Sequence, residues 1–251
     1  MKKICTRILR DSTETAVGLF IVMLVAVAFA WASGAPWKGK PYQQWDDKDI
    51  ERVFLDSPWA RTTTVTRTWL PISSKDLPDK IISGSGRSLP TELERSGETS
   101  VGGELNFYVL WASSRVMRAA LARKSVLHGD KKDLDVEKYA SEAQEEIQIL
   151  VQSEDMAPFT RKDEKFFQAN TFLQPRKSKQ RISPSHVRYE RDAKGILVTS
   201  ALFFFPRKTA TGERTIASDE KTVEFNCNMD GVSLRVNFEP QKMVDQNGAT
   251  L

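Results

Sequence analysis

Residues 222–240 read TVEFNCNMDGVSLRVNFEP, and this stretch decides the fold. Apolar side chains occupy alternate positions on both sides of Asp230-Gly231, which is the pattern of two half-buried strands. Asp-Gly favours a two-residue hairpin turn, because both turn residues must adopt a positive φ. A turn of this length fixes the register, and it predicts four apolar cross-strand pairs on one face: Met229–Val232, Cys227–Leu234, Phe225–Val236 and Val223–Phe238.

The rest of the chain mixes helical and strand patterns, which predicts an α+β fold. Helices are expected after caps at Asp46, at Ser113 or Ser114, at Asp135 and at Thr160; the last should carry Phe166, Phe167, Phe172 and Leu173 and end at Pro175. Strands are expected at 61–70, 105–111, beyond a switch near Glu146, 185–191 and 195–205. We therefore expect about three helices packed on a mostly antiparallel sheet, with the Asp-Gly hairpin as its C-terminal edge region.

The N-terminal segment predicts export. A cationic stretch precedes an uncharged apolar run from Ala16 to Ala32, and Ala30-Trp31-Ala32 gives the small-x-small pattern of a signal peptidase site before Ser33. A retained single-pass inner-membrane anchor is the alternative, because the run is about as long as the shortest bilayer span. Residues 1–32 are thus a signal peptide or a membrane anchor, residues 33–44 a linker, and residues 45–251 a single domain with a long flexible loop at 71–104.

Charge and cysteine content exclude some classes of function. The formal net charge of the 251 residues is +4, and half of it lies in the first 32 residues, so no nucleic-acid partner is expected. Of the two cysteines, Cys5 lies in the export segment, which leaves Cys227 without a disulfide partner. The hairpin register places Cys227 on the apolar face, where a buried structural thiol is expected rather than a nucleophile.

Three sequence blocks carry a family resemblance. They are Trp45 with Ser57-Pro58-Trp59-Ala60, then Phe107-Tyr108-x-x-Trp111-x-Ser113-Ser114 with Arg118-Ala119, and Phe238-x-x-x-x-Met243-Val244. Together they resemble a group of uncharacterised exported proteins common in soil acidobacteria, some of them described as GWxTD-type. The resemblance implies export and brings no known active site.

No catalytic or metal-ligating motif stands out. The two histidines, His128 and His186, lack the spacing of a metal site, so neither a metal nor another cofactor is expected. The densest basic run, Arg176, Lys177, Lys179 and Arg181, is expected to be a solvated loop that could touch anionic lipid or polysaccharide. Trp37, Tyr42 and Trp59 would form a binding platform for an envelope protein or polysaccharide if they were exposed together. The alternative is that these three side chains belong to the core.

Two classes of function follow. The first is an exported, envelope-associated or periplasmic module without enzymatic activity, with its working surface on the N-terminal aromatics and the 71–104 loop and with the hairpin as scaffold only. The second is a secreted hydrolase with a carboxylate-based site drawn from Asp46, Asp49 or Glu104, supported if those carboxylates lie in a cleft with raised pKa. A pocket that brings His186 together with an acid and a Ser or Thr within hydrogen-bond reach would count against the first class.

Overall fold

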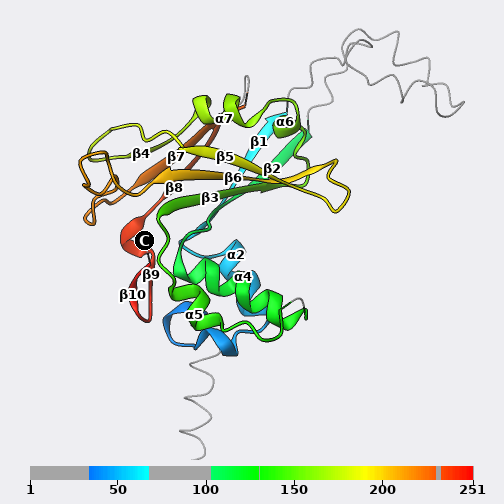
Figure 1. Ribbon diagram of the computed structural model, residues 1–251, viewed down its shortest axis with the longest axis vertical. Helices are drawn as coiled ribbons and strands as arrows, with labels where there is room; N and C mark the ends of the chain where they lie inside the picture. Colours follow the sequence, from blue (N-terminus) through cyan, green and yellow to red (C-terminus); the bar gives the residue numbers. More distant parts are fainter. Residues whose placement is uncertain (1–33, 68–102, 130, 230–232, 251) are drawn as a thin grey trace, which may run out of the picture. The chain divides into compact units, whose positions relative to one another are not determined.

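The structure is a computed structural model, and it describes residues 34–67, 103–129, 131–229 and 233–250 (Figure 1). The contacts divide the chain into two compact units, which are described separately. The first comprises Met1–Trp59, Ser113–Gln144 and Pro240–Leu251, and the second comprises Ala60–Ala112 and Glu145–Glu239. The α+β fold is confirmed: the described residues form antiparallel sheets of five, three and two strands, with three helices of seven or more residues.

The second unit contains the predicted hairpin pairing. Strand β7 (Val223–Asn228) pairs antiparallel with β8 (Ser233–Phe238), and Val223–Phe238, Phe225–Val236 and Cys227–Leu234 are cross-strand partners as expected. Their side chains are buried, so alternation correctly predicts which face is apolar. Residues 230–232, which include the expected turn and one member of the fourth pair, are not among those described. Strand β4 (Thr171–Pro175) pairs with the other edge of β7, which gives the order β4-β7-β8.

A five-stranded antiparallel sheet completes the β-structure of this unit. Its strands, in the order β1-β2-β3-β6-β5, are β1 (Ala60–Arg67), β2 (Gly103–Trp111), β3 (Glu146–Ser153), β6 (Val198–Pro206) and β5 (His186–Arg191). The strand predictions, including the switch near Glu146, are confirmed over the described residues except at the start of β6. Strand β6 is an inner strand with both faces buried over most of its length, as its apolar sequence predicts.

The start of β6 differs from the prediction. Ile196 and Leu197 lie in the β5–β6 turn and are 65% and 62% exposed. Asp192 accepts hydrogen bonds at Oδ1 from both of their N–H groups, at 2.8 and 3.0 Å. This local side-chain contact takes those N–H groups out of the strand pairing, so the strand begins only at Val198.

Aromatic side chains fill the space between the two sheets. The Phe225 ring of β7 lies 5.5 Å from Phe203 and 6.4 Å from Phe205 of β6, and Trp111 of β2 lies 5.1 Å from Phe238 of β8. These edge-to-face contacts are a favourable geometry for buried rings. The sheets therefore pack face to face, with the inner side of the hairpin as one wall of the core.

The prediction of a single helix from Thr160 to Pro175 is wrong. Its sequence instead forms α6 (Ala157–Thr160), α7 (Glu164–Asn170) and β4. Asp163, not Thr160, caps α7, and its carboxylate accepts a hydrogen bond from the N–H of Phe166 at 2.8 Å. Phe172 and Leu173 leave the helix because they pair with Asn226 and Phe225 of β7. Tertiary pairing thus overrides the apparent helical spacing.

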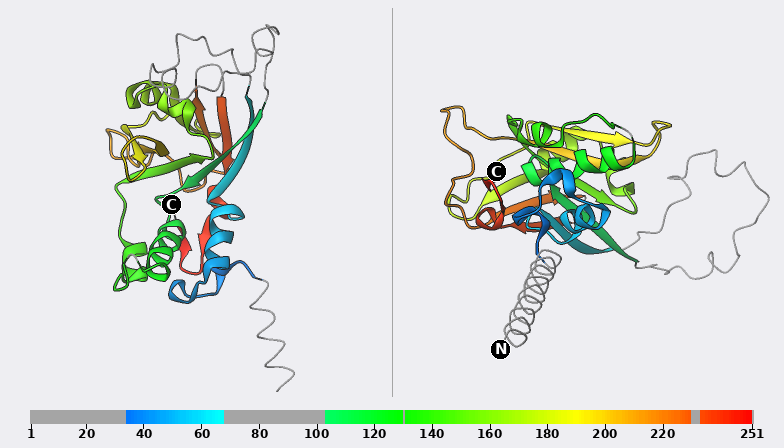
Figure 2. Two further views of the ribbon diagram at one scale, coloured as in Figure 1. Left: turned by 90° about the vertical axis from the view of Figure 1, so that its right-hand side faces the viewer. Right: turned by 90° about the horizontal axis from the view of Figure 1, so that it is seen from below.

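The first unit gathers three separate segments of the chain, which Figure 2 shows in blue, green and red. Its elements are η1 (Pro36–Lys38), η2 (Tyr42–Gln44), α2 (Asp47–Leu55), α4 (Arg115–Leu127), α5 (Val136–Ser141), η4 (Pro240–Lys242) and the hairpin of β9 (Val244–Asp245) and β10 (Gly248–Ala249). The predicted caps are confirmed: Asp46 forms a capping box with Asp49, Ser114 caps α4 and Asp135 caps α5.

The described residues include only part of the N-terminal region for which predictions were made. The segment expected as a linker, residues 33–44, contains η1 and η2, and its Trp37 and Tyr42 side chains are buried. The export segment and nearly all of the 71–104 loop fall outside the described ranges; Gly103 and Glu104 already belong to β2. Across the described ranges, no helix is both long and apolar enough to cross a membrane. The proposed domain boundaries stay predictions.

Candidate functional site

The aromatic platform expected at Trp37, Tyr42 and Trp59 is not on the surface. Their exposed fractions are 5%, 0% and 0%. The rings of Trp37 and Trp59 meet edge-to-face at 5.5 Å, and Trp59 Nε1 donates a hydrogen bond to Thr250 Oγ1 at 2.7 Å. The C-terminal residues thus cover these side chains, and the core alternative describes them correctly.

Tyr42 belongs to a buried polar cluster around Asp245. The Asp245 carboxylate accepts hydrogen bonds from Arg115 Nε at 2.7 Å, Arg115 Nη2 at 2.8 Å and the N–H of Asn247 at 2.7 Å, as well as one from the Tyr42 hydroxyl. Burial and the adjacent carboxylate raise the pKa of Tyr42, and the same carboxylate raises the pKa of Arg115. These four bonds use the carboxylate oxygens fully. The cluster holds the C-terminal segment in place and leaves little capacity for a ligand.

Cys227 is buried, as the hairpin register predicts. Burial raises the pKa of its thiol to about 12. The thiol is therefore neutral at physiological pH and is a poor nucleophile.

The two histidines lie in different environments. His128 is exposed, with Nε2 3.1 Å from Asp47 Oδ1. His186 lies at the start of β5, and its ring stacks on Phe204 at 4.0 Å. Ser185 Oγ is 3.1 Å from His186 Nδ1 and donates a hydrogen bond to Glu146 Oε1, so a serine, a histidine and an acid do meet here.

Their geometry differs from that of a catalytic triad. In a triad the acid holds one ring nitrogen and the serine uses the other. Here Ser185 and Glu146 approach the same nitrogen, since Glu146 Oε1 is 4.0 Å from His186 Nδ1. Ser185 Oγ also lies 3.1 Å from the carbonyl oxygen of Phe204, and the His186 side chain is 53% exposed. The cluster therefore does not activate Ser185 as a triad would.

The carboxylates considered for a hydrolase have other roles. Asp46 and Asp49 accept hydrogen bonds from each other's backbone N–H at 2.9 and 3.1 Å, which caps α2. The N–H of Asp49 lowers the pKa of Asp46, which is the opposite of what a general acid needs. Glu104 is exposed on β2. Among the described residues, no group of three or more His, Cys, Asp and Glu side chains could hold a metal ion.

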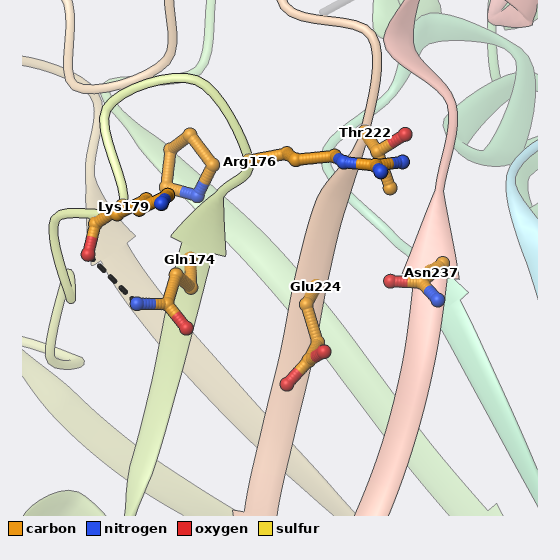
Figure 3. Close-up of a pocket in the computed structure, with 7 residues that line it drawn as sticks. Gln174, Arg176, Lys179, Thr222, Glu224 and Asn237 are labelled. Atoms are coloured by element: carbon orange, nitrogen blue, oxygen red, sulfur yellow. Dashed lines mark hydrogen bonds between the residues drawn. The ribbon is translucent and has the colours of Figure 1, made fainter.

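The strongest candidate site is a hollow on the outer face of the β4-β7-β8 sheet (Figure 3). It is an open hollow with a volume of about 400 Å³, within the range of small-molecule pockets. Gln174, Glu224 and Asn237 are cross-strand neighbours on three adjacent strands and form one row across the sheet. The remaining lining residues are Pro175, Arg176, Lys179 and Thr222. We call this the sheet pocket.

A loop held by backbone hydrogen bonds supplies the cations of the sheet pocket. Beyond β4, the N–H of Arg176 donates to the carbonyl of Thr222 at 2.9 Å, and the N–H of Lys177 donates to the Glu220 carboxylate at 3.2 Å. Glu220 is 2% exposed and also accepts from the N–H groups of Lys221 and Thr222. The loop is therefore fastened to the connection that precedes β7.

Lys179 has an unusual backbone conformation at this loop. Its φ is +56°, the only positive value at a non-glycine residue in the described chain. Its N–H donates to the carbonyl of Pro175 at 2.9 Å, and its carbonyl accepts from Gln174 Nε2 at 2.7 Å. A side chain in this region of φ is uncommon, and such residues cluster at functional sites.

The charges of the sheet pocket are not balanced within it. Over the described part of the chain, Arg176 and Lys179 have no carboxylate oxygen within 4.0 Å, whereas Lys177 pairs with Asp219. Figure 3 shows Arg176 extending from the end of β4 towards Thr222, above Glu224. Two cations and one carboxylate leave an excess positive charge. The site is suited to an anionic ligand that also forms hydrogen bonds.

Sequence reasoning named most of these residues without joining them. The basic run and the polar side of the hairpin lie more than 40 positions apart in the sequence. Only the pairing of β4 with β7 brings Gln174 beside Glu224. Treating residues 171–175 as the end of a helix concealed that pairing. The hairpin is thus more than scaffold, since its outer face lines the sheet pocket.

Comparison of the chain with protein-family models, with curated proteins and with solved structures gave no match. The resemblance to exported acidobacterial proteins therefore stays a prediction.

Proposed function

We propose that the protein is an exported, envelope-associated module that binds a polar ligand in the sheet pocket and does not transform it. The observation that carries the proposal is the pair of cations, Arg176 and Lys179, held by a fastened loop over a polar row and without carboxylate partners among the described residues. Because hydrogen bonds already hold the backbone of this loop, the loop loses little conformational freedom when a ligand binds.

The lining residues favour binding over catalysis. They comprise amides, two cations, one carboxylate, a threonine and a proline. Covalent catalysis needs a nucleophile with an adjacent base, and general acid–base catalysis needs groups with suitable pKa values. The lining supplies hydrogen bonds and charge instead.

A co-sedimentation experiment tests the proposal. The full-length chain, purified in mild detergent, is mixed with insoluble cell-envelope material, and the bound fraction is measured for wild type and for the double variant Arg176→Gln/Lys179→Gln. We expect the double variant to bind about tenfold more weakly or worse, because it loses two charge-assisted contacts. The matched control is Lys131→Gln/Lys132→Gln, which removes two exposed cations from the first unit. Equal binding by the two double variants would refute the proposal.

The same mixtures separate this proposal from the secreted hydrolase. After prolonged incubation, a binding module leaves the envelope material intact. Release of soluble fragments in proportion to protein and time would replace the proposal with the hydrolase alternative. The variants Ser185→Ala and Glu146→Gln would then show whether the cluster at His186 is responsible.

Export is tested independently of the ligand. We expect cell fractionation and mass determination to find a mature chain that begins at Ser33. An intact Met1 in the membrane fraction would show that residues 16–32 are retained as an anchor.

A further inference from the structure

We infer that the ligand of the sheet pocket is an acidic saccharide, that is, a chain of sugar units that carry carboxylate groups. This inference rests on the proposed function and adds the chemical class of the ligand.

The cations require an acidic group. The guanidinium of Arg176 can donate two parallel hydrogen bonds to one carboxylate, and Lys179 adds a second positive charge to the lining of the sheet pocket. Arg176 and Lys179 are both exposed residues, so ligand carboxylates reach them without being buried. A neutral ligand would leave both charges unused.

The other groups require hydroxyl donors on the same ligand. The Gln174 amide already donates from Nε2 to the Lys179 carbonyl, so Oε1 is the atom that it offers as an acceptor. Glu224 presents a carboxylate, whose oxygens accept hydrogen bonds, and its Oε1 accepts one from Asn226 Nδ2 at 3.4 Å. Asn237 is exposed and offers both a donor and an acceptor. A ligand with closely spaced hydroxyl groups satisfies these acceptors, whereas a ligand with carboxylates alone is repelled by Glu224.

The surface beside the pocket indicates an extended ligand. Two residues back along β4, the next row on the outer face is Phe172, Asn226 and Arg235, of which Asn226 is buried and Arg235 is exposed. The Arg181 guanidinium lies over the Phe172 ring, 4.5 Å from its centroid. This row lies about 7 Å from the first, the distance of two residues along a strand. Exposed cations, Arg181 and Arg235, therefore recur along the strand direction, as a polymer with an acidic group on successive units would need.

Three defined probes test the inference with the full-length chain. The first is a short oligogalacturonate, the second is its methyl ester, which keeps the hydroxyl groups and removes the charge, and the third is polyglutamate, which keeps carboxylates and lacks the hydroxyl groups. Dissociation constants are measured by titration calorimetry at low salt. We expect the oligogalacturonate to bind about tenfold or more tightly than either of the others, with an affinity that falls as salt is added.

Variants place the binding in the sheet pocket. Arg176→Gln/Lys179→Gln should lose oligogalacturonate binding by about tenfold or more, while Lys131→Gln/Lys132→Gln should keep it. Glu224→Gln keeps an acceptor and removes a repelling charge, so its affinity for the oligogalacturonate should equal or exceed that of wild type. A large loss on this substitution would contradict the assigned role of Glu224.

The outcomes separate the two proposals. Equal binding of oligogalacturonate and methyl ester overturns the acidic character of the ligand, and equal binding of polyglutamate points to an acidic peptide. If all three probes fail while envelope binding still depends on Arg176 and Lys179, the inference is overturned and the proposed function stands. If envelope binding is also independent of the two cations, both are overturned.

Discussion

Replacing Asp245 with alanine removes the centre of the buried cluster in the first unit. The side chain of Asp245 is fully buried, and Arg115 donates two hydrogen bonds to it, at 2.7 and 2.8 Å. Removal of one member of a buried ion pair costs about 3–5 kcal/mol, because the remaining charge loses its compensation. Since the Arg115 side chain is 24% exposed and can reach water, we expect a loss of about 3 kcal/mol, at the lower end of this range.

Urea denaturation monitored by tryptophan fluorescence measures this loss, because Trp37, Trp45 and Trp59 all lie in the first unit. Tyr42→Phe removes a single donor to the carboxylate and should cost less, about 1.5–3 kcal/mol. Asp219→Ala is the control: it removes an exposed carboxylate that pairs with Lys177, and the unfolding midpoint should not move. A loss below about 1 kcal/mol for Asp245→Ala would refute the conclusion that the cluster around Asp245 holds the C-terminal segment in place.

Three further predictions concern stability and reactivity. In a Cys5→Ser chain, Cys227 should resist alkylation at pH 8 and react fully in denaturant. Burial raises the pKa of its thiol from 9.0 to about 12, so the stability that the neutral thiol contributes is complete below about pH 9 and is lost as pH rises towards 12. Measuring the unfolding free energy at a series of pH values would detect this loss. Ser114→Ala should lower the unfolding free energy by about 0.5–2 kcal/mol, because the hydroxyl that accepts from the N–H of Met117 at 3.2 Å disappears. Ser114→Thr, which keeps a capping hydroxyl without adding a charge at this buried position, should recover part of the loss. The double change Ile196→Ser/Leu197→Ser should stay within about 0.5 kcal/mol of wild type in the same assay, since both side chains are mostly exposed, and a larger loss would show that they pack against a neighbour.

Local patterns predicted much of the fold. The alternation around Asp230-Gly231 gave the register of β7 and β8, because a one-residue slip would turn every apolar side chain outward. The capping box at Asp46 and Asp49 was equally readable, since both of its hydrogen bonds join residues three positions apart. In each case the residues that interact are close in the sequence or are aligned by a short turn.

The predictions failed where a residue contacts a partner that is distant in the sequence. Trp59 was a candidate for exposure because its partner, Thr250, lies 191 positions away. The spacing of Phe166, Phe167 and Phe172 fitted a helix, and only the pairing of Phe172 with Asn226 of β7 makes it part of a strand. The sheet pocket depends on the same pairing, so separate sequence segments could predict neither its shape nor which of its cations lack a carboxylate partner among the described residues.

The composition of the first unit has a consequence for the order of events during synthesis. Tyr42, Trp59 and Arg115 all find their hydrogen-bonding partners among residues 245–250, at the far end of the described chain. Until those residues leave the ribosome, the early segments have no means of completing this unit. The second unit needs nothing beyond Glu239, so it can close first. A chain that lacks residues 245–250 therefore leaves the first unit unfinished, with exposed aromatic side chains that chaperones and proteases can recognise.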